Sequence, residues 1–259
     1  MAALAGVEAV TTVPCTAEFW AELGVAPDTR FTKRQNLTLT HLYRQTAEGW
    51  LLNVDGDELL YFAGQTIAEA VDGFDDDLET VRVETAEAIQ TEAEDGRHHF
   101  RLSMDRMLAR QVYEGNAILF ARRKGMVGHH VGKSFIRAGI AGATLRQHWG
   151  MDAKGGELKG RALGAADGAY LLHYLDNGYE QWRAKVDWRA ASNGFHPHLK
   201  ARVDEINASD DPEAGFRALY TTLFCFDADR LARLEAAGCH LALALDDDAV
   251  SVSIPANTA

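Results

Sequence analysis

The densest group of chemically capable side chains lies between Arg122 and Lys133, in the run RRKGMVGHHVGK. Three successive bases precede a glycine-rich stretch that carries two histidines and ends in a lysine. Glycines let a backbone approach phosphate closely, and successive N–H groups of such a loop can bind an anion. The spacing misses the P-loop motif, which would need a glycine where Val127 stands. The run therefore fits either a phosphate-binding loop or a glycine-rich surface loop.

The distribution of charge indicates what kind of partner the chain could attract. The formal net charge is −12, yet residues 97–161 hold 13 Lys and Arg against four acids. A second basic run, residues 30–46, has no acid, whereas residues 47–96 carry 15 acids and one base. A basic stretch on an acidic body attracts a polyanion locally while the body repels it elsewhere. The pattern predicts nucleic acid or another phosphate-rich ligand, or else a solvated basic face balanced by the acidic segment.

Proton transfer near neutral pH favours histidine, and His41 is the candidate for that role. It lies in the alternating run 37–43 beside the first basic run, although a lone histidine there also fits an ordinary core residue. One reaction that needs such a residue is metal-independent RNA cleavage, in which a ribose 2′-hydroxyl attacks the adjacent phosphate. The protein must then align the atoms, move a proton and stabilise the developing charge. His41 and Arg34 are assigned these two catalytic roles. The expected RNA or phosphate contacts are Arg30, Lys33, Arg106, Arg110, Arg122, Arg123, Lys124, Lys133, Arg137 and Arg146.

The sequence gives no reason to expect a metal or a cofactor. Adjacent histidines in an extended chain point to opposite sides and chelate poorly. His196 and His198 could point to one side, but no Cys, Asp or Glu stands nearby at the spacing that zinc needs. The three cysteines are widely spaced, which predicts reduced thiols in a cytoplasmic protein. We expect no membrane partner, because no apolar stretch is long enough to span a bilayer.

The C-terminus gives the clearest structural pattern. Residues 219–226 are rich in aromatic and β-branched side chains and predict a strand. Asp227 is placed to cap a helix over 228–237 that ends at Gly238. Residues 240–245 and 250–254 predict two further strands. The order strand, helix, strand, strand is most of a ferredoxin-like unit.

The rest of the chain predicts a mixture of helices and strands. Strands are expected at 37–43, 80–84 and 99–103, a hairpin at 50–54 and 59–63, and helices at 104–114, 134–149 and 170–188. We therefore predict an α+β fold of ferredoxin-like (RRM-type) units with an inserted basic helical segment. The expected regions are an N-terminal α+β region, 1–103, a basic and largely helical region, 104–206, and a C-terminal unit, 207–259, that could pack with the first.

Two stretches resemble CRISPR-associated RNA-binding and RNA-processing proteins built on ferredoxin-like domains. Residues 132–146, GKSFIRAGIAGATLR, are similar to the pattern at the start of a helix in that superfamily, and the C-terminal unit is the second stretch. An arginine-rich helix over 104–114 would also suit an RNA hairpin. The resemblance implies RNA binding, metal-independent and site-specific cleavage of a structured CRISPR-type RNA, and a place among the subunits of a ribonucleoprotein complex.

Two other functions remain open on the sequence alone. The chain could be an enzyme that binds a small phosphorylated ligand at the loop 125–134. It could also be a protein–protein interaction module, in which the basic segment docks on an acidic partner or on the acidic segment of a second copy.

Overall fold

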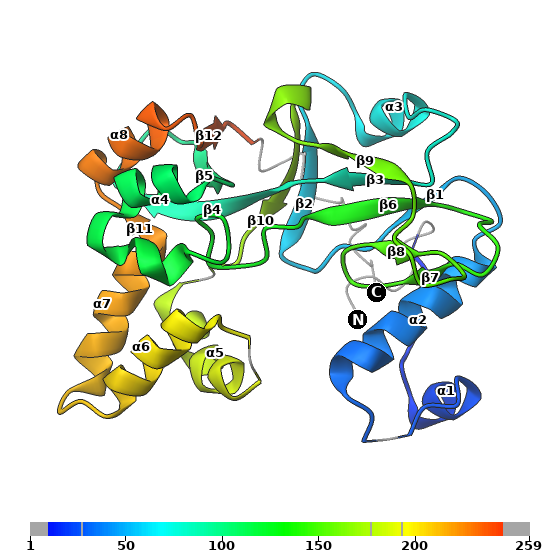
Figure 1. Ribbon diagram of the computed structural model, residues 1–259, viewed down its shortest axis with the longest axis horizontal. Helices are drawn as coiled ribbons and strands as arrows, with labels where there is room; N and C mark the ends of the chain where they lie inside the picture. The colour runs from blue at the N-terminus through cyan, green and yellow to red at the C-terminus, as the bar shows by residue number, and fades with distance from the viewer. Residues whose placement is uncertain (1–9, 27, 177, 193, 246–259) are drawn as a thin grey trace, which may run out of the picture.

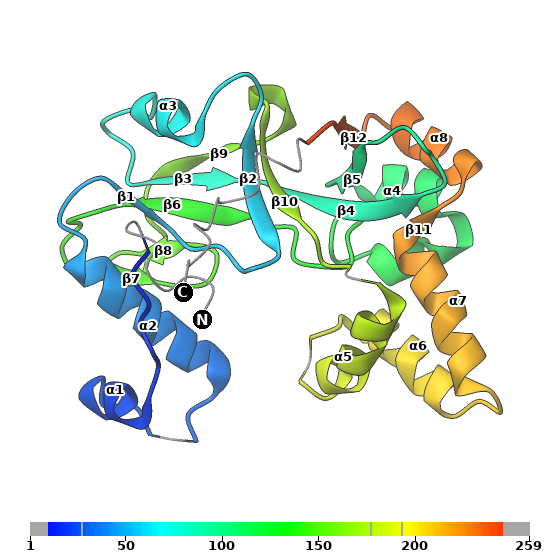
Figure 2. The same cartoon turned by 180° about the vertical axis from the view of Figure 1, so that it is seen from behind.

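The structure, a computed structural model, describes residues 10–26, 28–176, 178–192 and 194–245 and is of the α+β class (Figures 1 and 2). Its helices are α1 (Ala17–Glu22), α2 (Phe31–Gln45), α3 (Ile67–Asp72), α4 (Arg106–Tyr113), α5 (Tyr179–Ala191), α6 (Pro197–Asn207), α7 (Pro212–Phe224) and α8 (Ala228–Ala236), with 3-10 segments η2 (Glu114–Phe120) and η3 (Ala165–Asp167). Its strands are β1 (Trp50–Leu52), β2 (Glu58–Phe62), β3 (Thr80–Val83), β4 (Thr85–Thr91), β5 (His98–Leu102), β6 (Lys133–Arg137), β7 (Thr144–Leu145), β8 (Gly150–Met151), β9 (Gly160–Leu163), β10 (Ala169–His173), β11 (Cys225–Phe226) and β12 (His240–Leu243).

A nearly continuous central strand joins the two main sheets. β3 pairs with β6 and β9 in one sheet, and β4 pairs with β5 and β10 in the other. Only Glu84 separates β3 from β4, and its N–H and C=O still bond to Leu163 and Leu171. Figure 1 shows the two strands in line across the molecule. One stretch of backbone therefore positions both halves of the protein.

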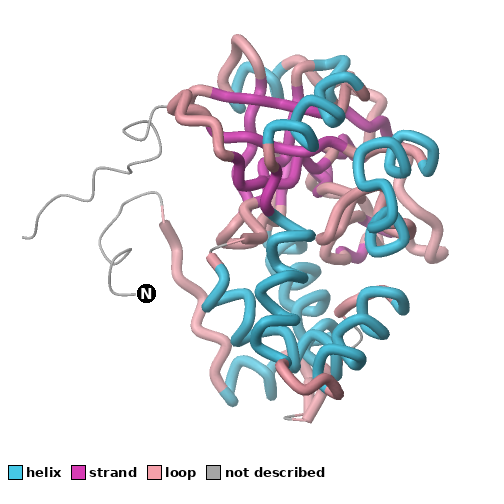
Figure 3. The backbone as a smooth tube through the Cα atoms, turned by 90° about the vertical axis from the view of Figure 1, so that its left-hand side faces the viewer, coloured by secondary structure: helices cyan, strands magenta, loops and turns pink. Residues whose placement is uncertain are grey.

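One half is a helical body at the end of β4. Helices α4 to α8 and η2 pack around a core of aromatic side chains that includes Phe120, Trp182, Phe216 and Phe224. β11 and β12 hydrogen-bond to β4 and β5, so C-terminal residues complete a sheet begun in the N-terminal region. Viewed end-on in Figure 3, the strands lie in the upper part of the molecule and much of the helical structure lies below them.

In the other half of the molecule, hydrogen bonds join α2 to the segment that follows β6. Tyr43 donates its hydroxyl to the Arg137 carbonyl at 2.8 Å and accepts from the Ile140 N–H at 3.0 Å. Thr40 accepts from the Leu145 N–H at 2.9 Å. These bonds close a small core of Tyr43, Ile136, Ala143, Leu145 and Leu158.

Residues 37–43 lie inside α2, so the expected strand is wrong. Thr38 and Thr40 donate their hydroxyls to the carbonyls of Arg34 and Asn36, one turn earlier. Such bonds to the preceding turn accommodate β-branched residues in a helix. The alternation of leucine and threonine is therefore no sign of a strand here, and His41 lies on a helix.

The expected helix over 134–149 is also wrong, because the segment forms β6 and β7. The turn between them contains Gly139 and Gly142, which have φ angles of 79° and 73°. Positive φ is incompatible with a right-handed helix and is readily adopted by glycine. The region 104–206 holds five strands, β6 to β10, so its expected largely helical character is corrected to a mixed one.

Residues 219–226 belong mostly to α7, and the expected strand is reduced to β11. Asp211 caps this helix and Pro212 occupies its first turn. The helix capped by Asp227, the left-handed Gly238 after it and the strand that begins at His240 are confirmed. The predicted strand 250–254 lies outside the described residues.

The hairpin expected across Asp55 and Gly56 is wrong, although both of its strands exist. β1 pairs with β6 in the first sheet, and β2 pairs with β10 in the second. The turn at Asp55 and Gly56 therefore connects a strand of one sheet to a strand of the other. Among the helices of the described residues, none has the length and apolar character needed to cross a membrane.

Candidate functional site

The glycine-rich run Arg122–Lys133 wraps around a carboxylate of the protein itself. The N–H groups of Val127 and Gly128 donate to the carboxylate of Glu87, at 2.9 and 2.5 Å. Burial raises the pKa of Glu87, but the charge of Arg101 and these hydrogen bonds hold it below its ordinary value. Glu87 is therefore ionised, and it occupies two of the N–H groups that the sequence offered to a phosphate.

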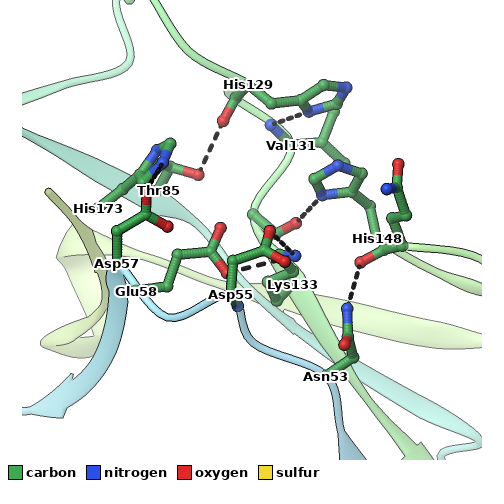
Figure 4. A network of polar contacts seen from close by, with 12 residues as sticks. Asn53, Asp55, Asp57, Glu58, Thr85, His129, Val131, Lys133, His148 and His173 are labelled. Carbon is green, nitrogen blue, oxygen red and sulfur yellow. Dashed lines mark hydrogen bonds and ion pairs between the residues drawn. The ribbon is translucent and has the colours of Figure 1, made fainter. Parts of the chain in front are cut away.

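His129 of this run and His148 lie in a network of polar contacts that also includes Thr85 and Lys133 (Figure 4). The ring of His129 stacks on that of His148, with centroids 4.1 Å apart. His148 Nδ1 is 2.8 Å from the Gly132 carbonyl oxygen, so the neutral ring carries its proton there and leaves Nε2 as the basic atom. His129 Nδ1 accepts from the Val131 N–H at 3.3 Å. Burial lowers the pKa of His148, and burial with the neighbouring positive groups lowers the pKa of His129 to about 3.

This stacked pair makes stability depend on pH. The unfolded chain returns His129 to its ordinary pKa of 6.5, so it binds a proton below that pH while the native ring stays neutral down to about pH 3. We expect the free energy of unfolding to fall as the pH drops through this window, by at most about 1.4 kcal/mol per pH unit for one such group and less for a partly exposed ring. Urea unfolding between pH 7 and pH 4 measures the slope.

His129→Asn keeps an acceptor for the Val131 N–H and removes the titrating group. It is expected to make the pH dependence of stability shallower than in the wild type. His198→Gln, which removes an exposed imidazole on α6, is the matched control. An unchanged slope in His129→Asn would show that the proton uptake belongs to other groups.

Lys133, an expected phosphate contact, is buried between two carboxylates. Its Nζ lies 2.8 Å from Asp55 Oδ2 and 3.2 Å from Glu58 Oε2, and its side chain is 1% exposed. Figure 4 shows the lysine directed at both acids, with Asp57 and His173 beside them. The charge is neutralised within the protein, so the assignment of Lys133 to a ligand is corrected.

Two further expected contacts hold the fold together. Arg137 donates to the carbonyls of Leu78 and Asp75, at 2.7 and 2.9 Å, and lies over the Trp50 ring. The guanidinium of Arg123 donates to the carbonyls of Gly128 and Gly194, at 3.2 and 3.3 Å. Both arginines thus connect segments of the chain, and their contact with phosphate stays a prediction.

Four of the expected contacts meet around one pocket of about 450 Å³, here called the α4–η2 pocket. It lies between α4, η2 and the loop after η2. Its basic residues are Arg106, Arg110, Arg122 and Lys124, and His198 reaches it from α6. Within the ranges that the structure describes, none of the four cations has an ion pair with a carboxylate. The pocket is therefore open to an external anion.

Two carboxylates also line the α4–η2 pocket, and both are engaged. Asp105 caps α4 by accepting from the N–H groups of Met107 and Leu108, at 2.7 and 2.9 Å. Glu114 lies 3.6 Å from a guanidinium nitrogen of Arg233. The four cations outnumber these two acids, so the lining of the hollow carries a net positive charge.

The backbone explains why these cations converge. The Met104 N–H donates to the Lys124 carbonyl at 2.8 Å, which brings the beginning of the glycine-rich run next to the start of α4. Lys124 and Gly125 make this turn with φ angles of 49° and 83°. Tyr113 then donates its hydroxyl to the Gly125 carbonyl. The basic run and the arginine-bearing helix are thus held side by side.

The remaining expected residues lie on α2, at its N-terminus, or directly after β7. Lys33 and His41 line a second pocket together with Arg146, whereas the exposed Arg30 precedes the helix as its N-cap residue. Arg34 places its guanidinium 5.5 Å from the centre of the Trp20 ring and does not line this pocket. The two catalytic candidates therefore share a helix but not a pocket.

Three site residues were missed at the sequence level. Glu87 and His148 meet the glycine-rich run only through contacts between residues far apart in the sequence. Glu87 lies 40 residues before Val127, and His148 lies 16 residues after Gly132. His198 stands more than 70 residues beyond the rest of its pocket. Over the part of the chain that the structure describes, no group of three or more His, Cys, Asp or Glu is arranged to hold a metal ion.

Comparison with known proteins adds no family to this geometry. No family model, no curated protein and no solved structure matches the chain.

Proposed function

We propose that the protein binds RNA and that the α4–η2 pocket contacts its phosphate backbone. The observation that carries the proposal is the convergence on one hollow of four cations that have no carboxylate partner among the described residues, in a chain whose net charge is −12. Phosphate contacts provide most of the affinity of a protein for nucleic acid. The acidic remainder of the chain would repel the strand and so confine it to the basic surface.

Removing two of these cations tests the proposal. Arg106 and Arg110 are exposed on α4, so replacing both with alanine, a good helix former, removes charge without opening the core. We expect Arg106→Ala with Arg110→Ala to weaken binding of a labelled RNA hairpin by about tenfold or more at low salt. The slope of log affinity against log salt should become shallower by about 2, since each phosphate contact contributes about 0.9. Fluorescence anisotropy between about 50 and 200 mM salt gives both quantities.

Lys159→Ala with Arg161→Ala is the matched control. These exposed residues lie at β9 in the other half and are paired with Asp77 and Asp167. The control removes the same charge from the chain, so it separates a local contact from a change in net charge. Equal affinity and slope in the wild type and the α4 variant would show that the pocket is not the binding surface.

Cleavage of the bound RNA is the second part of the proposal. It rests on His41, whose Nε2 lies 2.9 Å from Gln45 Nε2 beside a basic pocket. A denaturing gel of the same samples, with EDTA present, shows whether one site is cut and whether His41→Ala abolishes the cut. Intact RNA in the wild type would leave a binding protein without this activity.

The resemblance noted in the sequence suggests the biological setting. A structured, CRISPR-type hairpin is the RNA that we propose as partner, with other subunits of a ribonucleoprotein complex in the cytoplasm. A ferredoxin-like unit belongs to the same proposal. Pairing of β12 with β5 and the α8 helix before it are compatible with such a unit but do not define it.

A further inference from the structure

A second basic pocket lies in the half of the molecule that contains α2. It has a volume of about 340 Å³ and lies between α2 and β7, and we call it the α2–β7 pocket. Its wall carries Lys33, Arg44 and Arg146, and no carboxylate of the described residues lines it. Arg146 contacts Met151 Sδ through its Nε, and neither of the other two cations has an ion pair within the described ranges. This hollow is more uniformly basic than the α4–η2 pocket.

The α2–β7 pocket is held in shape by hydrogen bonds between distant segments. Thr40 accepts from the Leu145 N–H at 2.9 Å, which ties the middle of α2 to β7. Gln147 donates its side-chain amide to the side-chain oxygen of Gln35. Both walls are therefore fixed before a ligand arrives, which lowers the entropic cost of binding.

One polar atom in this wall lacks a partner. Asn36 lines the pocket, and its buried Oδ1 has no hydrogen-bond partner among the described residues. Buried polar atoms are nearly always satisfied in native proteins, so a hydrogen-bonding partner in the pocket would favour rotation of this amide to meet it. An amide beside cations suits a ligand that carries both a phosphate and a hydrogen-bonding base edge.

We infer that the α2–β7 pocket holds one nucleotide of the bound RNA strand. Its phosphate lies among Lys33, Arg44 and Arg146, and its base edge bonds to the Asn36 amide. The volume falls within the range of pockets that enclose small ligands. This inference rests on the proposed function, because it assigns a second contact to the same RNA.

The two pockets lie in different halves of the molecule. Figures 1 and 2 show α4 near the β4 end of the two aligned central strands and show α2 and β7 toward the β3 end. A strand long enough to enter both pockets gains from the second contact without a second loss of free motion. A short oligonucleotide can occupy only one pocket at a time.

Lys33→Ala with Arg44→Ala tests the inference, because both side chains are exposed on α2. We expect this variant to bind the RNA hairpin about tenfold or more weakly, and a short oligonucleotide only about twofold more weakly, since the α4–η2 pocket still binds it. Asn36→Ala should weaken binding of the hairpin without changing the salt slope. Photo-crosslinking with 4-thiouridine RNA should attach a nucleotide to a peptide from α2 or β7 in the wild type. Lys159→Ala with Arg161→Ala again serves as the control.

The outcomes separate the two proposals. Wild-type protein that fails to bind RNA at low salt would overturn the proposed function and this inference together. RNA binding that survives unchanged in the Lys33 and Arg44 variant, with no crosslink to α2 or β7, would overturn this inference alone. Thermal stabilisation by uridine monophosphate without RNA binding would assign the pocket to a free nucleotide and overturn its assignment to a strand.

Discussion

Glu87→Gln is expected to lower the free energy of unfolding by about 3–5 kcal/mol. Glu87 and Arg101 are both completely buried, with Arg101 Nε 2.7 Å from a carboxylate oxygen. The arginine also donates to the Leu223 carbonyl and lies over the rings of Phe120 and Phe226. The variant leaves the guanidinium buried without its counter-charge.

The geometry of the glycine-rich run adds to this cost. The Glu87 carboxylate accepts from Arg101 and from the N–H groups of Val127 and Gly128, so every neighbour on this side is a donor. A glutamine places an NH₂ group among those donors and leaves one of them unsatisfied. The free energy of unfolding should therefore fall by more than the loss of one ion pair would cause.

Urea unfolding of Glu87→Gln against Glu157→Gln measures the difference. Glu157 pairs with Arg82 at the surface, where its side chain is 56% exposed, and its loss should cost less than about 1 kcal/mol. Replacing both Glu87 and Arg101 with methionine should cost less than the sum of the single changes, since no charge is left unpaired. Equal stability losses in Glu87→Gln and Glu157→Gln would contradict the prediction.

Gly132→Ala is the second change with a large expected effect. Gly132 has a φ of 79°, and a Cβ atom there would lie 1.9 Å from the Val83 carbonyl oxygen. The obstruction is backbone of β3, which is paired on both sides and cannot move alone. We expect a loss of about 4 kcal/mol or more in the free energy of unfolding, because overpacking against fixed backbone is among the few mechanisms that reach this range.

Gly139→Ala provides a matched control with the same φ of 79°, and no atom of the residues that the structure describes lies within 4 Å of the added Cβ. It should cost only the left-handed backbone conformation, about 1–2 kcal/mol. The difference between the two variants, from urea or thermal unfolding, isolates the steric contact. Similar losses of unfolding free energy in the two variants would show that the β3 backbone can shift to make room for the added Cβ.

The sequence predicted features that depend on neighbours along the chain. The spacing of Arg106 and Arg110 indicated a helix that presents both on one face, and α4 has them in one pocket. The helix after Asp227 was predictable because its cap and its terminal glycine are local signals. The basic runs 30–46 and 97–161 likewise contain the lysines and arginines of both pockets.

Long-range contacts were beyond the reach of sequence patterns. The composition of residues 219–224 is typical of a strand. Phe216, Leu219 and Leu223 also recur at helical spacing, and the packing of these buried side chains in the tertiary structure stabilises the helix α7. The role of the glycine-rich run depended on Glu87, whose approach no local pattern reveals. Lys133 looked available to a ligand because its partners Asp55 and Glu58 lie more than 70 residues earlier.

The central strand has a consequence for which RNA molecules could bind. β3 and β4 are separated only by Glu84, which remains hydrogen-bonded to Leu163 and Leu171, so the strand offers no hinge between the halves. The separation of the two basic pockets is therefore a fixed length set by the backbone. Under the RNA binding proposed above, a protein built this way would act as a ruler, selecting RNA by the distance between two of its phosphates ahead of the identity of its bases.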